Sequence, residues 1–336
     1  MNYKGISFYL SLFCFPISLL AFINILYASY FDYFLSIETY FSTLIVSLTV
    51  GSALYYYGKS SKKNISFFEQ LILVITSYFL TSLLIAIPFY LSNYQVTFLN
   101  SIFESISGLT GTGFSIFKNI KYLDPTLILW RSSSQWIGGL FFLIFLIIIF
   151  SNKSFNYKMT NISYSEESSI NSGGNIKDNI SKVLIIYSIL SIIILTLLNF
   201  SGLRLFNSLN MSMTLISGGG FIPTDSIDKI ISTNFQKIIF IFSLIVSMLN
   251  FYLFFNLFNK NTLIKEHRED FYLIILSTVF CIFIYFNNYQ GLDIIISVVS
   301  SLANSGLTLV NSDNNLSLYF LFITIIGGSL ISNTSG

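Results

Sequence analysis

Three short segments rich in glycine and hydroxyl residues interrupt a chain that is otherwise strongly apolar. These glycine segments consist of Thr110, Gly111, Thr112, Gly113, Ser217, Gly218, Gly219, Gly220, Ala303, Asn304, Ser305 and Gly306. Glycine adopts backbone angles that other residues resist, so such a segment can aim its carbonyl oxygens to one side. Carbonyl oxygens arranged in this way can replace the water shell of a passing cation. Because no carboxylate lies in any segment and divalent cations prefer charged oxygens, the pattern favours a monovalent cation.

The three glycine segments agree in register when they are aligned on Gly113, Gly220 and Gly306. Six residues before each of these anchors is a hydroxyl residue: Ser107, Thr214 and Ser300. Thirteen residues before each anchor is a short polar residue of the kind that caps helix N-termini: Asn100, Asn207 and Asp293. We therefore expect a half-helix to start at each of these three residues and to lead into a glycine segment. Simple packing and turn glycines remain the alternative, which agreement at several offsets disfavours.

Half-helices that surround one axis would point their C-terminal ends at its centre. Each such end carries a partial negative charge, which favours a cation there. The same order of span, half-helix, glycine segment and span occurs in all three units, so we interpret them as parallel repeats related by an axis along the membrane normal.

The composition places the chain among membrane proteins. Hydrophobic residues make up 54% of the sequence and charged residues only 10%, whereas a soluble protein carries roughly a quarter charged residues. A net charge of +2 gives no basic patch for nucleic acid. Cys14 and Cys281 lie in apolar runs and are interpreted as apolar filler, and His267 is expected on a solvated loop. The spans hold almost no titratable residues, which disfavours an enzyme; a structural or assembly subunit would not need the repeated segments.

Apolar runs of about 20 residues can cross a bilayer as helices. Such runs occupy residues 6–30, 38–57, 67–93, 128–150, 183–202, 236–258 and 271–287, with a shorter run at 316–326. The positive-inside rule places Lys4 and the basic loop 59–63 in the cytoplasm. We thus expect an all-α integral membrane protein of helix–pore-loop–helix repeats around a central ion pore.

The predicted organisation has five parts. A two-helix hairpin (1–63) precedes a first repeat (64–151), a cytoplasmic loop (152–181), a second repeat (182–259) and a third repeat (260–336) that is truncated within its second helix. Three walls cannot seal a pore, so we expect four repeats and interpret this chain as an N-terminal fragment of a longer protein.

Two charges lie near the first glycine segment. Glu104 falls in the predicted first half-helix, and Arg131 opens the following span at the same depth. A charge held away from water needs a partner, so we expect the two to pair and brace the segment; two independent interfacial charges are the alternative. Trp130 and Trp136 are expected at the membrane interface, in packing roles.

The sequence resembles the TrkH-type potassium transporter subunits, relatives of the KtrB and HKT proteins. The resemblance rests on residues 103–113 (FESISGLTGTG), 129–139 (LWRSSSQWIGG) and 218–221 (GGGF). The final stretch, 327–336, is similar to the loop that interrupts a helix of the family's third repeat. The resemblance implies a gate formed by Gly327, Gly328, Ser332, Asn333, Thr334, Ser335 and Gly336.

The same resemblance implies potassium uptake in the bacterial inner membrane, with potassium as the substrate and no covalent cofactor. It also implies a homodimer surrounded by lipid, and a cytoplasmic nucleotide-binding regulatory subunit of the TrkA type. Two departures from the family pattern, Gly111 within the first segment and residues 303–305 in the third, leave a less selective K⁺/Na⁺ transporter as an alternative.

Overall fold

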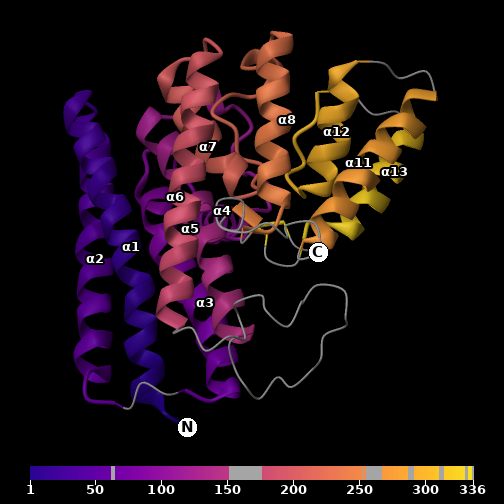
Figure 1. The fold of residues 1–336 in the computed structure, drawn as a ribbon. Coiled ribbons are helices and arrows are strands. Elements are labelled where there is room, and N and C mark those ends of the chain that lie inside the picture. The colour runs from indigo at the N-terminus through magenta and orange to yellow at the C-terminus, as the bar shows by residue number, and fades with distance from the viewer. Residues whose placement is uncertain are drawn as a thin grey trace.

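The computed structural model describes residues 1–61, 65–150, 176–251, 253–254, 267–286, 291–309, 314–329 and 332–334. The regular structure of these residues is helical (Figure 1). The helices are α1 (Tyr3–Tyr30), α2 (Phe34–Gly58), α3 (Phe67–Leu91), α4 (Phe98–Leu109), α5 (Pro125–Phe150), α6 (Ile176–Phe200), α7 (Leu205–Ile216), α8 (Asn234–Met248), α11 (Arg268–Phe286), α12 (Leu292–Leu302) and α13 (Asn314–Ile326), with short 3₁₀ turns at Ile120–Tyr122 and Ile227–Lys229. The predicted loop 152–181 lies largely outside the described residues.

Helices α1 and α2 form an antiparallel hairpin at one side of the molecule (Figure 1). Their close approach depends on glycine: a Cβ at Gly58 would lie 2.5 Å from the backbone nitrogen of Phe8. The hairpin is tied to α3 at its start, because the Glu69 carboxylate accepts the backbone N–H of Asn2 and, at 2.7 Å, that of Ser66.

The remaining helices form three units in which a short helix lies between two others. The first unit is α3–α4–α5, the second is α6–α7–α8 and the third is α11–α12–α13. The short helices α4, α7 and α12 have 12, 12 and 11 residues. About 20 residues are needed to cross a bilayer, so these three are half-helices, as the sequence predicts.

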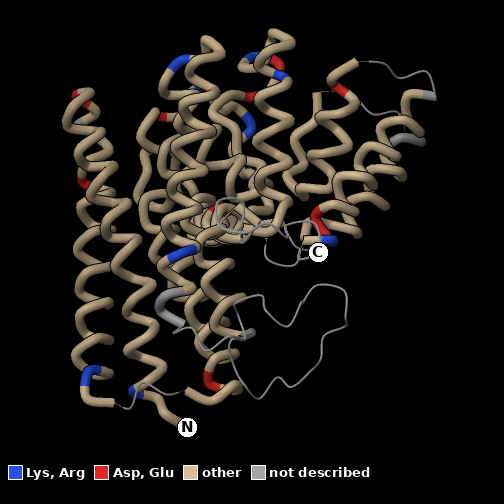
Figure 2. Tube along the Cα trace, viewed as in Figure 1, with Lys and Arg blue, Asp and Glu red and all other residues tan. Residues whose placement is uncertain are grey.

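Among the described residues, five helices are long and apolar enough to cross a membrane: α1, α2, α3, α5 and α6. Large apolar side chains such as Leu19, Phe79 and Ile192 are about 60–70% exposed on these helices, which suits a surface in contact with lipid. Charged residues lie mostly towards the two ends of the bundle (Figure 2).

Two predictions about helix ends are wrong. Asn100, Asn207 and Asp293 do not cap the half-helices; the capping positions are Thr97, Arg204 and Gly291, so the three polar residues fall inside the first helical turn. The predicted span 236–258 is also interrupted, because α8 ends at Met248 and Leu249 is extended, with a ψ of 156°.

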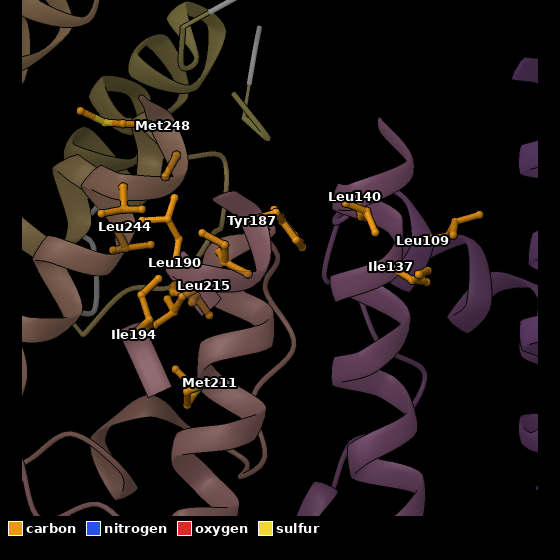
Figure 3. Packing of buried hydrophobic residues seen from close by; sticks show 14 of the residues in the cluster. Leu109, Ile137, Leu140, Tyr187, Leu190, Ile194, Met211, Leu215, Leu244 and Met248 are labelled. Atoms are coloured by element: carbon orange, nitrogen blue, oxygen red, sulfur yellow. The ribbon is translucent and has the colours of Figure 1, made fainter. Parts of the chain in front are cut away.

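Buried apolar side chains hold the half-helices against their neighbours (Figure 3). Leu109, the last residue of α4, lies beside Ile137 and Leu140 of α5. Leu215, near the end of α7, belongs with Leu244 and Met248 of α8 to the same core. The C-terminal ends that lead into the glycine segments are therefore the best-packed parts of the half-helices.

Candidate cation filter

The glycine segments share a left-handed turn two residues before each anchor, although the anchors themselves differ: Gly113 and Gly306 have positive φ values and Gly220 does not. Two residues before each anchor, Gly111, Gly218 and Asn304 have φ values of 72°, 67° and 50°. This left-handed conformation costs most residues energy but is tolerated by glycine and, less readily, by asparagine. The third segment, which departs from the other two in sequence, thus keeps their backbone because asparagine can replace glycine at this position.

Backbone hydrogen bonds close all three turns, and one set of them has the same spacing throughout. The N–H groups of Gly111, Gly218 and Asn304 donate to carbonyls three residues earlier, at 3.1, 3.1 and 3.2 Å. The carbonyls of the predicted hydroxyl positions accept from the segments as well: Ser107 from Gly113 (3.5 Å), Thr214 from Gly219 (2.9 Å) and Ser300 from Ser305 (3.1 Å). In this second set the first unit differs, because Ser107 accepts from the anchor itself, whereas Thr214 and Ser300 accept from the residue before it. Each half-helix therefore ends in a tight turn that fixes where its glycine segment begins.

The hydroxyls six residues before the anchors serve the segments in two units. Ser107 Oγ donates to the Phe114 carbonyl at 2.6 Å, and Ser300 Oγ lies 2.9 Å from Ser305 Oγ. The Thr214 hydroxyl is buried and makes no hydrogen bond. Side chains at this position hold the first and third segments against their own half-helices.

The three segments lie side by side. A Cβ built on Gly113 would lie 2.6 Å from the Gly220 Cα, and one built on Gly220 would lie 2.7 Å from the Ser305 carbonyl oxygen. The second segment is thus flanked by the first and third, with no space for side chains between them. Ser217, Gly218 and Gly219 are accordingly buried, while Thr110, Thr112 and Asn304 of the flanking segments are exposed.

Glu104 and Arg131 form an ion pair beside the first segment, which confirms their predicted pairing. Arg131 Nε lies 2.8 Å from Glu104 Oε1, and the two side chains are 1% and 0% exposed. The same carboxylate accepts from Ser115 Oγ and from the Ile116 N–H, both at 2.9 Å. The pair therefore holds the chain directly after the first glycine segment.

Arg131 also reaches the second unit. Its guanidinium lies 4.2 Å from the ring centroid of Phe221, a cation–π distance, and the Phe221 N–H donates to Gln135 Oε1 at 3.1 Å. One turn of α5 thus positions the residues after both segments. Sequence reasoning gave Ser115 and Gln135 no role in the site, although Gln135 belongs to the 129–139 motif.

Glycines of α5 allow this approach. A Cβ on Gly138 would overlap the Leu109 carbonyl, and one on Gly139 would lie 2.9 Å from the Ser217 Cβ. Both glycines belong to the 129–139 motif. The structure shows why glycine is needed at these positions, because the ends of α4 and α7 lie directly against them.

The described part of the predicted gate loop lies against the second unit. Asn333 Nδ2 donates to the Ile216 carbonyl at 2.6 Å, at the end of α7. The Ser329 N–H donates to the Met248 carbonyl at 2.9 Å, where α8 ends. Within the loop, the Gly328 N–H donates to the Thr334 carbonyl at 2.7 Å. Ser335 and Gly336 lie outside the described residues.

The interruption after α8 has a second partner. The buried Asp270 carboxylate accepts the Asn250 N–H at 2.8 Å, and its other oxygen lies 3.3 Å from His267 Nδ1. The His267 side chain is only 9% exposed, so the prediction of a solvated histidine is wrong. Its proximity to Asp270, which packs against the second unit, explains the burial.

Two further predicted residues have partners that the sequence did not indicate. Trp130 is 1% exposed and donates to the Ile85 carbonyl at 3.1 Å, so its predicted packing role is confirmed. Asp293 pairs with Lys237 of α8.

Asp225 links the loops that follow the first two segments, since it accepts the Lys121 N–H at 3.1 Å. Lys229 and this N–H hold the pKa of Asp225 below its ordinary value.

Comparison with known proteins places this arrangement in context. Residues 36–269 match the TrkH family, described as cation transport protein. The chain is 26% identical over 279 residues to an uncharacterized cation transporter of Methanocaldococcus jannaschii, covering 82% of this chain and 58% of that protein. It is 27% identical over 239 residues to the Trk system potassium uptake protein TrkH of Escherichia coli K12, covering 68% and 48%.

A solved structure has the same fold. The crystal structure of the potassium transporter TrkH from Vibrio parahaemolyticus superposes with a TM-score of 0.83 at 20% identity, covering 99% of this chain and 72% of that one. The chain spans about half the length of the curated relatives it matches.

Proposed function

Because the chain belongs to the TrkH family of cation transport proteins, we propose that it carries potassium ions across a membrane along the glycine segments. The observation that carries this proposal is the shared left-handed turn at Gly111, Gly218 and Asn304, in three segments that lie side by side. Backbone carbonyls presented by such turns can replace the hydration shell of an ion.

The ends of the half-helices add to this proposal. α4, α7 and α12 each end where a glycine segment begins, so their partial negative charges meet at one place. The segments carry neutral oxygens only, and a monovalent cation suits such a set better than a divalent one.

The loop 327–334 is proposed as the gate. Its contacts with the Ile216 and Met248 carbonyls place it against the second unit, directly beside Gly218, whose added Cβ would overlap Thr334. A loop held by a few hydrogen bonds can move aside as a two-state element. In the proposed switch, the loop blocks the ion pathway when it is in place, and ions flow when it is displaced.

The setting of the protein is also part of the proposal. We place it in the bacterial inner membrane, as the family resemblance implies, and its N-terminus in the cytoplasm, because the basic residues Lys4 and Lys59 lie at that end. The relative from Escherichia coli is named as part of a Trk system, which supports a multi-component assembly. A homodimer with a cytoplasmic nucleotide-binding subunit of the TrkA type is the proposed form.

Uptake of ⁸⁶Rb⁺ by cells that express the gene, in a host without its own potassium uptake, tests the proposal. Gly113→Asp should abolish uptake, because a side chain there would meet the Gly220 backbone. Gly202→Asp is the matched control: Gly202 also has a positive φ, of 91°, but no atom lies within 4 Å of its added Cβ. Uptake that survives Gly113→Asp as well as Gly202→Asp would rule out the filter.

A less selective K⁺/Na⁺ transporter is the second candidate. The observation that favours it is the exposed Asn304 side chain, which stands where the other two segments have glycine. In the same cells, ²²Na⁺ uptake comparable to ⁸⁶Rb⁺ uptake would select this candidate, and Rb⁺ uptake that excess Na⁺ leaves unchanged would select the potassium-specific one.

A further inference from the structure

A cavity of about 50 Å³ lies between the N-terminal hairpin and the first unit, away from the glycine segments. It is formed where α2 begins, α3 ends and α5 begins. Its lining is unusually polar for a junction between apolar helices, with Ser36, Thr39, Ser92, Asp124 and Thr126 among its residues. One water needs about 10–15 Å³ of such a cavity, so the space can hold a small ion with a few waters.

Three hydroxyl groups among the lining residues are available as acceptors. Each hydroxyl has one proton, and the helix carbonyls take it: Ser36 Oγ donates to Tyr33, Thr39 Oγ1 to Ser36 and Ser92 Oγ to Phe89, at 2.9, 2.7 and 2.7 Å. The lone pairs of the three oxygens remain free for a ligand. The lining also has possible donors, in Asn93 and Tyr40, but its one charged group is the Asp124 carboxylate, so it suits a positively charged ligand.

Asp124 supplies the one negative charge. Its Oδ1 accepts the Thr126 N–H at 3.3 Å and thereby caps α5, while its backbone N–H donates to the Tyr94 phenol oxygen at 2.6 Å. In the part of the chain that the structure describes, no lysine or arginine pairs with this carboxylate. Capping accounts for one oxygen and leaves the charge uncompensated.

Thr126 provides an independent sign of a ligand. The residue lines the cavity and is 0% exposed, yet its Oγ1 makes no hydrogen bond of ordinary geometry, although the Tyr40 phenol lies beside it. A buried hydroxyl left unpaired costs free energy comparable to a lost hydrogen bond. A ligand in the cavity would satisfy it.

We propose that this cavity binds a monovalent alkali cation, held by the Asp124 carboxylate and the hydroxyl oxygens around it. One carboxylate balances one positive charge, whereas calcium is usually held by several, and no group of three or more His, Cys, Asp or Glu that could hold a metal occurs among the residues searched. The ion would link α2 of the hairpin to the start of α5. This site is distinct from the glycine segments and does not depend on their proposed role.

Tryptophan fluorescence can report the binding. The Tyr40 ring lines the cavity and lies 5.6 Å from the ring of Trp130. The chain has two tryptophans, so Trp136→Phe leaves Trp130 as the single reporter. The purified variant would be titrated with NaCl or KCl against N-methylglucamine chloride at constant ionic strength, and a saturable change in emission is expected.

Substitutions in the cavity separate this site from others. Asp124→Asn should weaken the apparent affinity about tenfold or more while keeping the helix cap, because asparagine caps as well as aspartate does. Thr126→Val, similar in shape and uncharged, should weaken it too. Asp228→Asn, at an exposed aspartate outside the cavity, is the matched control and should change nothing.

A Gly113→Asp background distinguishes the cavity from the filter. The response should persist there even though transport is lost, so failure of the proposed function would leave this inference standing. The inference would be overturned by no saturable response to either ion, by an equal response in Asp124→Asn, or by loss of the response in Gly113→Asp.

Discussion

At the scale of single residues, the Glu104–Arg131 pair contacts the residues that follow the first two glycine segments. Both side chains are almost completely buried, and the carboxylate also holds the backbone of Ile116. Glu104→Gln keeps the shape and leaves the Arg131 charge unpaired. Removing one partner of a buried pair costs about 3–5 kcal/mol, so we expect a markedly lower unfolding temperature in detergent and reduced ⁸⁶Rb⁺ uptake.

The control for this prediction is Asp225→Asn. Its partner Lys229 is 56% exposed and stays hydrated when the aspartate charge is lost, so little change in unfolding temperature is expected. The double exchange Glu104→Arg with Arg131→Glu should restore only part of the stability, because the new arginine cannot accept the Ile116 N–H. Equal effects of Glu104→Gln and Asp225→Asn would contradict a bracing role.

The sequence allowed the Glu104–Arg131 pair to be predicted, because both charges fall at one depth in apolar surroundings. It did not allow the helix caps to be assigned. Asn100, Asn207 and Asp293 lie in the first turn, two or three positions after the capping residue. Polar residues suit several positions of an exposed helix start, so composition alone cannot fix which one begins the helix.

At the scale of elements, the interruption after α8 shows what apolar patterning misses. The run 236–258 is continuous and contains neither proline nor glycine, so nothing local marks its end. Hydrogen bonds from the third unit stabilise the end of α8 instead. The Ser329 N–H donates to the Met248 carbonyl, and the Asp270 carboxylate accepts the Asn250 N–H. Partners this distant in sequence are invisible to a local pattern. The three half-helices were predictable because their lengths and flanking glycines are local.

The proposed gate gives a prediction at this scale. Asn333→Ala removes the hydrogen bond from the loop to the Ile216 carbonyl. A net hydrogen bond is worth about 1 ± 0.5 kcal/mol. If it exists only in the closed state, the ratio of open to closed protein should rise about two- to twelvefold. Basal ⁸⁶Rb⁺ flux should increase accordingly.

Thr324→Ala is the matched control for the gate. Thr324 lies in α13 just before the loop, and its hydroxyl bonds only its own helix, at the Leu321 carbonyl. Basal flux should stay at the wild-type level in this variant. A flux that Asn333→Ala leaves unchanged, or that Thr324→Ala raises equally, would argue against the loop as the gate.

At the scale of the whole molecule, the order of long and short helices followed from the sequence, but the mutual placement of the segments did not. Register alignment shows that Gly113 and Gly220 are equivalent; only the packing of α5 against α4 and α7 brings them into contact. That packing depends on Gly138 and Gly139, whose role lies in long-range contacts. Repeats are therefore readable from sequence, while the site they form depends on the helices between them.

Orientation in the membrane is the last prediction. Lys4 lies at the start of α1 and Lys59 directly after α2, and basic residues are seen at the end of the bundle that holds the N-terminus (Figure 2). Lys229 and Lys237 pair with Asp225 and Asp293. With Cys281 replaced by alanine and Cys14 fully buried, Lys59→Cys and Asp228→Cys provide one exposed thiol each. An impermeant maleimide added to intact spheroplasts should label Asp228→Cys and reach Lys59→Cys only after permeabilisation. The reverse labelling pattern would invert the proposed topology and place the cavity that Asp124 lines on the cytoplasmic side.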